Sequence, residues 1–146
     1  MKKVISYNTE AKNQIIPITE DIAGVAKESG IKNGTLFAYT LHTTLGLIMQ
    51  ESCEPFLCQD IIDQLTKIVD DNGAKYKHRC SANPKKLCKT DDINGPSHVR
   101  QALTNQSIVI DIENGKLNLG TYQDIGLVEF DGPRKDRKVL VKIIKD

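Results

Sequence analysis

Short runs in which apolar and polar residues alternate occur along most of the chain, and such alternation is typical of β-strands with one buried face. The predicted strands are Val4–Tyr7, Gln14–Ile18, Thr35–Tyr39, Ser107–Ile112, Leu117–Leu119, Ile125–Phe130 and Val139–Ile144. The polar residues 8–13 predict a hairpin between the first two strands, and Asn114-Gly115 predicts a hairpin after the fourth. Leu47–Met49 either continues the strand that runs into Thr44 or returns from it.

Three further segments show the spacing of amphipathic helices. Thr19 is predicted to cap the first helix, which Gly30 closes. Pro55 opens the second helix and Gly73 is predicted to end it, whereas Gly95-Pro96 begins a short third helix. The apolar positions of the first helix are Ile22, Val25 and Ala26, and those of the second are Phe56, Ile61, Ile62, Leu65, Ile68 and Val69.

Strands dominate this pattern, and the helices are inserted between them. No repeat, linker or low-complexity tract divides the 146 residues, a length that suits one compact domain with a substantial core. The pattern therefore predicts a single α+β domain over residues 1–146. Between residues 74 and 93 the periodicity disappears under charged and polar residues, and we interpret this long loop as a flap over a pocket.

The charge balance excludes two classes of partner. With 20 Lys and Arg against 19 Asp and Glu, the chain lacks the basic field that attracts nucleic acid or an anionic membrane. Lys85-Lys86 and residues 134–138 are local basic turns without interleaved aromatic residues. No apolar run approaches the roughly 20 residues of a membrane-spanning helix, and the apolar start is too short for a signal peptide. We expect a cytoplasmic protein that binds neither nucleic acid nor membrane.

Four cysteines raise the question of zinc or disulfides. Their spacing, Cys53 and Cys58 followed by Cys80 and Cys88, lacks the close pairs of a zinc ribbon. We favour reduced, individually placed thiols over a four-thiolate zinc site. A disulfide between Cys80 and Cys88 stays open, because the loop that holds them is long and polar.

Three histidines, His42, His78 and His98, are the candidate centre of a site. Any one histidine taken alone is more often structural, and none lies in an H-E-x-x-H zinc motif. Three converging imidazoles can hold a divalent metal with an open position for water, or, partly protonated, can cradle a phosphate. Both uses favour a small anionic or hydrolysable substrate.

Three ordered blocks of sequence make the case stronger. The chain resembles the YjbQ-like family, small uncharacterised proteins often labelled secondary thiamine-phosphate synthases. The blocks are Leu41-His42-Thr43-Thr44-Leu45-Gly46-Leu47, ending near Glu51; Tyr76-Lys77-His78 with Asp91-Asp92-Ile93-Asn94-Gly95-Pro96-Ser97-His98; and Leu119-Gly120-Thr121-Tyr122-Gln123 with Glu129-Phe130-Asp131-Gly132-Pro133-Arg134. The match is close over roughly the last two thirds of the chain. Tyr122, Leu45 and Gln50 depart from the residues usual in the family, and the loop after Cys80 is longer.

The resemblance implies a set of site residues and an assembly. The implied catalytic residues are Glu51, His42, His78 and His98, the three histidines also being the candidate ligands of a divalent metal such as Zn or Mg. The implied substrate-binding residues are Thr43, Thr44, Asn94, Gln123, Glu129 and Arg134. The resemblance also implies layered, mainly antiparallel sheets and a homotrimer with the pocket close to a subunit contact.

Three functions compete on this basis. The first is an enzyme acting on a small phosphorylated metabolite, of which thiamine-phosphate synthase-like transferase activity is the concrete form that the resemblance implies. The second is a zinc-dependent hydrolase of an ester or phosphoester, in which a metal-bound water with a pKa of about 7 attacks the substrate. The third is a non-catalytic trimer that binds an anion or metabolite. Turnover and stoichiometric zinc discriminate between them.

Overall fold

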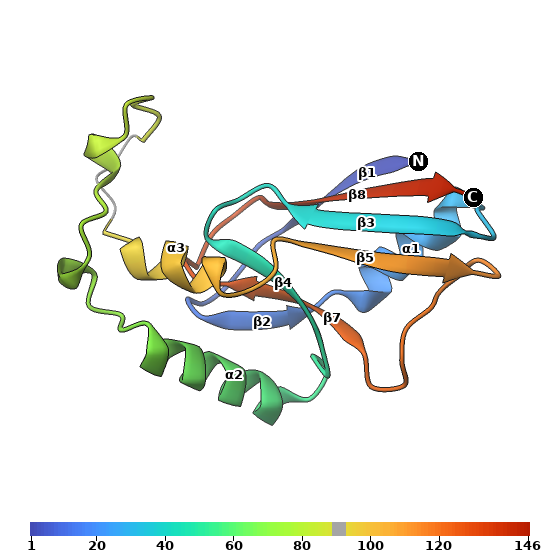
Figure 1. Cartoon of the computed structure of the whole chain (residues 1–146), viewed down its shortest axis with the longest axis horizontal. Coiled ribbons are helices and arrows are strands. Elements are labelled where there is room, and N and C mark those ends of the chain that lie inside the picture. Colours follow the sequence, from blue (N-terminus) through green and yellow to red (C-terminus); the bar gives the residue numbers. More distant parts are fainter. Residues whose placement is uncertain (89–92) are drawn as a thin grey trace.

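Two antiparallel β-sheets and three α-helices make up the computed structural model, which describes residues 1–88 and 93–146 (Figure 1). The larger sheet has the order β1 (Lys2–Tyr7), β8 (Arg137–Lys145), β3 (Gly34–Thr40), β5 (Ser107–Glu113) and β6 (Lys116–Leu117). The smaller sheet has the order β2 (Gln14–Pro17), β7 (Asp124–Glu129) and β4 (Leu45–Gln50). The predicted α+β class with mainly antiparallel sheets is confirmed.

The partners of the strands differ from the expected ones at the N-terminus. The predicted hairpin between the first two strands is wrong, because β1 pairs with β8 in the larger sheet and β2 pairs with β7 in the smaller one. The polar segment between them crosses from one sheet to the other, and the Thr9 amide donates to the Arg134 carbonyl oxygen at 2.8 Å on the way. The hairpin at Asn114-Gly115 is confirmed, with φ angles of 53° and 79° that suit a two-residue turn.

The main core lies between the inner face of the larger sheet, the smaller sheet and α1 (Thr19–Ser29). Alternation along each strand supplies its side chains, including Leu36, Ala38, Ile108, Ile110, Val139, Val141, Leu45 and Leu127. Thr19 does not cap α1 as predicted. Its hydroxyl accepts a hydrogen bond from the Ile125 amide at 2.8 Å instead, so it ties the helix to β7, and no side chain caps the helix.

The second helix is shorter and less buried than its apolar stripe predicts. α2 runs over Pro55–Ile68, and the Glu54 carboxylate accepts hydrogen bonds from the first backbone amides. The helix ends at Ile68 because Val69 is extended, and Gly73 begins a separate 3-10 turn. Ile62 packs into a small core against the smaller sheet, whereas Phe56 and Ile68 are 80% and 71% exposed. No helix among residues 1–88 and 93–146 is long and apolar enough to span a bilayer.

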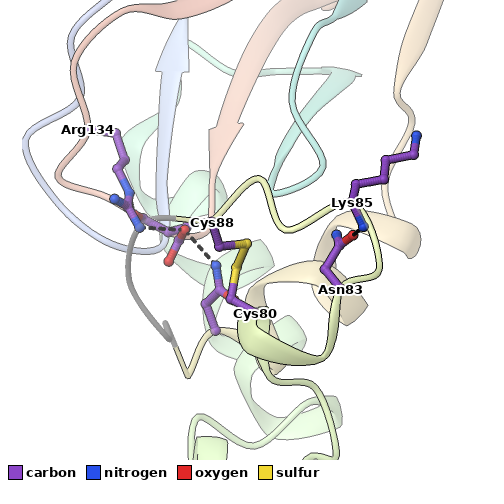
Figure 2. The surroundings of a disulfide bond; sticks show 7 residues. Cys80, Asn83, Lys85, Cys88 and Arg134 are labelled. Carbon is purple, nitrogen blue, oxygen red and sulfur yellow. Dashed lines mark hydrogen bonds and ion pairs between the residues drawn. A yellow bond between two sulfur atoms is a disulfide. The ribbon is translucent and has the colours of Figure 1, made fainter.

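The predicted flap contains two 3-10 turns, Gly73–Lys75 and Cys80–Ala82, and leads to α3 (Gly95–Ala102). Its described part projects from the body of the molecule (Figure 1). A disulfide joins Cys80 to Cys88 (Figure 2), so the expectation of four reduced thiols holds only for Cys53 and Cys58. Asp91 and Asp92 of the second sequence block lie outside the described residues.

Candidate functional site

Two of the three candidate histidines meet where the flap returns to α3. The rings of His78 and His98 lie edge to face, with their centroids 4.6 Å apart and their planes at 62°. Gly95 permits this approach, because a Cβ there would come within 2.6 Å of the Tyr76 Cβ and 3.4 Å of the His78 Cβ. The absence of a side chain at Gly95 therefore lets the segment around His78 lie directly on the start of α3.

Burial and the neighbouring imidazole both lower the pKa of His98. The pKa of His98 is lowered, first by burial and then by His78, while Asp131 and a hydrogen bond with the Thr43 backbone act in the opposite direction. Two polar atoms here are buried without a hydrogen-bond partner in the described chain, the His78 Nε2 and the Asn94 Oδ1. Such atoms are costly unless a ligand or water satisfies them, so this place is a candidate binding site.

Asn94 connects the histidine pair to an ion pair at the surface. Its amide nitrogen donates to Asp131 Oδ2 at 2.9 Å, and Arg134 Nη2 donates to the same oxygen at 2.9 Å. The Arg134 Nε also donates to the Asp131 carbonyl oxygen, yet its side chain stays 43% exposed. Ser97 adds a hydrogen bond from its hydroxyl to the Phe130 carbonyl oxygen at 2.7 Å, so α3 is fixed to the end of β7.

Arg100 anchors α3, and with it His98, from the opposite side. Its side chain is fully buried and donates to the Val69 carbonyl oxygen, to Asn13 and to Asp71. Val69 and Asp71 follow α2, whereas Asn13 precedes β2. The Arg100 guanidinium therefore joins α3 to two other segments of the chain. Nothing in the local sequence pattern around Arg100 signals this role.

His42 lies in the turn between β3 and β4, one residue before Thr43, whose backbone forms the hydrogen bond with His98. Its Nε2 accepts a hydrogen bond from the Lys138 amide at 2.8 Å, so the proton of the neutral ring is on Nδ1. Burial, followed by the Arg137 cation, lowers its pKa. The lone pair that a metal needs at Nε2 is therefore already occupied.

Glu129 is buried rather than open to a cleft in this chain. Its carboxylate is paired with Arg137, at 2.6 Å from Oε2 to the guanidinium Nε, and also accepts from the Thr9 hydroxyl and the Asp131 amide. Arg137 further donates to the Thr44 hydroxyl at 2.8 Å. Arg137 was not anticipated, although a charged residue in the alternating series that continues with Val139, Val141 and Ile143 signals an inward-facing partner for a buried acid.

Glu51 and Gln123 lie away from the histidines within one chain. In the β4–β7 pair, Leu45 lies opposite Glu129 and Gln50 lies opposite Asp124. The turn holding His42 and the segment holding Glu51 are thus at opposite ends of β4, roughly 20 Å apart at the rise of an extended strand. Gln123 is exposed at the far end, where its Oε1 accepts from the Gly120 amide at 2.9 Å.

A metal centre built from all three histidines does not follow from this geometry. Among residues 1–88 and 93–146, no group of three or more His, Cys, Asp or Glu side chains is placed to hold a metal ion. His78 and His98 offer two adjacent imidazoles, and His42 presents its occupied nitrogen to the backbone.

Comparisons with known proteins agree over nearly the whole chain. The family model described as "UPF0047 protein YjbQ-like" matches residues 3–146. A UPF0047 protein of Archaeoglobus fulgidus is 35% identical, with 96% of this chain and 98% of that protein covered. A UPF0047 protein of Methanocaldococcus jannaschii is 33% identical, with coverages of 100% and 97%.

Solved structures are similar in fold as well. An uncharacterised conserved protein of the YjbQ/UPF0047 family from Clostridium acetobutylicum is 37% identical and superposes with a TM-score of 0.83, covering 97% of this chain and 99% of that chain. A hypothetical protein from Aeropyrum pernix is 29% identical with a TM-score of 0.85, covering 100% and 99%.

Proposed function

Since the chain belongs to the YjbQ-like UPF0047 family, we propose that it is an enzyme that acts on a small phosphorylated metabolite beside His78 and His98. The observation that carries this proposal is the contact between two imidazoles at the start of α3, where Asp131, which acts electrostatically on His98, binds both Asn94 and Arg134. A proton-transferring pair next to a partly exposed guanidinium is suited to a phosphate group, whose oxygens accept hydrogen bonds and protons.

Each residue then has a distinct task. The lowered pKa leaves His98 neutral near pH 7, so it can accept a proton from the substrate. Arg134 and Asn94 contact the phosphate oxygens, and Asp131 orients both side chains through one carboxylate oxygen. A bound phosphate favours the protonated imidazole, so its arrival raises the pKa of His98 and couples binding to proton uptake.

Thiamine-phosphate synthase-like transfer is the finer form of the proposal, and it rests on the resemblance alone. The zinc hydrolase is the alternative enzyme, and a metabolite-binding trimer without turnover is the non-catalytic one. Elemental analysis of the purified chain separates the hydrolase, which requires about one zinc per active site. Turnover of phosphate esters and pyrophosphates separates both enzymes from the binding module.

The second part of the proposal is that copies of the chain associate through the outer face of the larger sheet. Phe37, Tyr39, Leu140 and Ile144 line a shallow cavity of about 810 Å³ on this face. Exposed apolar surface of this kind is typical of protein interfaces. We propose that a second copy of the chain covers it, as expected for the homotrimer.

The charges on this face favour a ring. Lys2 and Lys142 lie on β1 and β8 at one side, while Asp111 and Glu113 lie exposed on β5 near the other. A head-to-tail contact places acids against bases in every copy, and a closing head-to-tail contact gives a cyclic oligomer. Light scattering should give three times the 16.2 kDa chain mass, and Phe37→Asp should lower it while Tyr122→Asp should not.

The active-site proposal is tested with inorganic pyrophosphate as the probe, by titration calorimetry at pH 7. His98→Gln and Arg134→Gln should each weaken binding by about 10-fold or more, since each removes a charge-assisted hydrogen bond. Lys27→Gln on α1 is the matched control, because it removes an exposed charge from a helix that packs on β6, β7 and β8. Binding that is unchanged in both site variants would exclude this site.

A further inference from the structure

The disulfide lies close in sequence to one member of the histidine pair. Cys80 follows His78 by two residues, and its partner Cys88 is eight residues further on, with the two Cα atoms 5.8 Å apart. Figure 2 shows this bond with Arg134 of the candidate site among its surroundings. Cys53 and Cys58, the other two cysteines, remain free beside the start of α2.

A short, tightly folded stretch of chain joins His78 to the disulfide. The Arg79 guanidinium donates to the carbonyl oxygens of Tyr76 and His78, at 2.8 Å and 2.6 Å, which folds the chain tightly just before Cys80. On the other side, His78 and Tyr76 rest on Gly95 at the start of α3. His78 is thus held between the loop closed by the disulfide and the helix that carries His98.

Hydrogen bonds within the loop hold part of its chain. Residues 81–88 are exposed. The hydrogen bonds of Ala82, Asn83, Lys85 and Lys86 run to Arg79, Cys80 and Asn83, within the same loop. A covalent cross-link in such a segment removes much of its conformational freedom, and cleavage of the cross-link restores it.

We propose that Cys80 and Cys88 form a thiol–disulfide exchange site whose redox state sets the position of His78 against His98. In the oxidising direction, the Cys88 thiolate displaces one thiolate from a disulfide of the type RSSR, and the resulting mixed disulfide is attacked by the Cys80 thiolate. Two thiols lose two protons and two electrons in total, and RSSR becomes two RSH. A dithiol reductant reverses both steps and itself becomes a disulfide.

The reduced loop no longer restrains His78, so the pair with His98 loosens. Loss of the neighbouring imidazole and greater exposure to water both relieve the causes that lower the pKa of His98. The effect on substrate binding rests on the proposed function. The change in the two histidine environments does not, and it can be measured without any ligand.

The test uses the full chain, oxidised with glutathione disulfide or reduced with dithiothreitol. A thiol reagent should find two free thiols per chain after oxidation and four after reduction. In carbon-13 correlation spectra, the ring signals of His78 and His98 should shift on reduction while those of His42 stay in place. Only three histidines need assignment, which His→Gln variants provide.

Two variants keep the test decisive. Cys80→Ser with Cys88→Ser should give the reduced spectrum under both conditions, and Cys53→Ser should respond as the unaltered chain does. Four free thiols after oxidation would overturn the proposal, as would His78 and His98 signals that ignore the redox state. Failure of pyrophosphate binding alone would instead count against the proposed function, because the spectra contain no ligand.

Discussion

Two carboxylate–arginine pairs drawn from one stretch of nine residues behave very differently. The side chains of Glu129 and Arg137 are 0% and 7% exposed, whereas those of Asp131 and Arg134 are 15% and 43% exposed. Both pairs lie between the end of β7 and the start of β8. The same pairing chemistry therefore holds the fold together at one position and presents charge to solvent at the other.

The hydrogen bonds made by the buried Glu129–Arg137 pair explain its structural role. Arg137, the Thr9 hydroxyl and the Asp131 amide occupy both oxygens of Glu129, and Arg137 in turn holds the Thr44 hydroxyl. A charge enclosed in this way has no position left for a substrate. In the second pair, the Arg134 side chain instead stays 43% exposed while it binds Asp131.

The largest predicted effect comes from breaking the buried pair. Glu129→Ala leaves the Arg137 cation buried and unpaired, which should lower the free energy of unfolding by about 3–5 kcal/mol. Asp131→Ala removes a partner that is close to water, and should cost only about 1 kcal/mol or less. Urea denaturation of the two variants and the unaltered chain, at pH 7, measures the contrast.

Removing both charges together provides the control. In Glu129→Leu with Arg137→Met no charge is stranded, so the double variant should be more stable than Glu129→Ala. Equal losses of stability in Glu129→Ala and Asp131→Ala would show that burial does not distinguish the two pairs.

The local sequence pattern was sufficient to predict the helices and strands, but not to predict which strands pair with each other. The alternation at Ser107–Ile112 and the turn at Asn114-Gly115 predict β5 and its hairpin, because both signals are local. The pairing of β1 with β8 joins the two ends of the chain. Nothing in the sequence near residues 2–7 indicates that contact. The simpler hairpin between the first two strands was therefore predicted, and it is wrong.

Ordered sequence blocks likewise identified residues without placing them. His78 and His98 do come together, because Gly95 lets the flap lie on α3. Glu51 lies at the other end of β4 from His42, a separation that follows from strand length and not from motif order. Asp131 and Arg137 were missed, since their importance depends on which atoms they contact.

A smaller predicted effect is a loss of stability in mild acid. The pKa values of His42 and His98 are both lowered in the folded chain, so the unfolded chain binds protons more readily. Stability is fully present above the unfolded value of about 6.5 and declines as the pH falls toward the folded values. Urea midpoints measured from pH 7.5 to pH 5 should fall, and fall less in His98→Gln.

The variant His42→Gln tests the acid sensitivity beside the buried Glu129–Arg137 pair. Because the Arg137 cation contributes to the lowered pKa of His42, this variant should also reduce the acid sensitivity, independently of His98→Gln. A pH dependence that is identical in both variants and the unaltered chain would assign the acid sensitivity to other groups.

The smallest effect concerns salt, and it distinguishes the two pairs most directly. At 0.05 M salt, Arg134→Ala should cost about 0.5 kcal/mol of unfolding free energy, and at 0.5 M this cost should vanish, since ions screen an exposed pair. Arg137→Ala should cost the same at both concentrations, because its partner Glu129 is out of reach of solvent ions. Urea titrations at the two concentrations, with matched unaltered protein, measure this difference. A salt-sensitive Arg137→Ala would mean that water and ions enter the buried pair, and that Glu129 is open to a substrate after all.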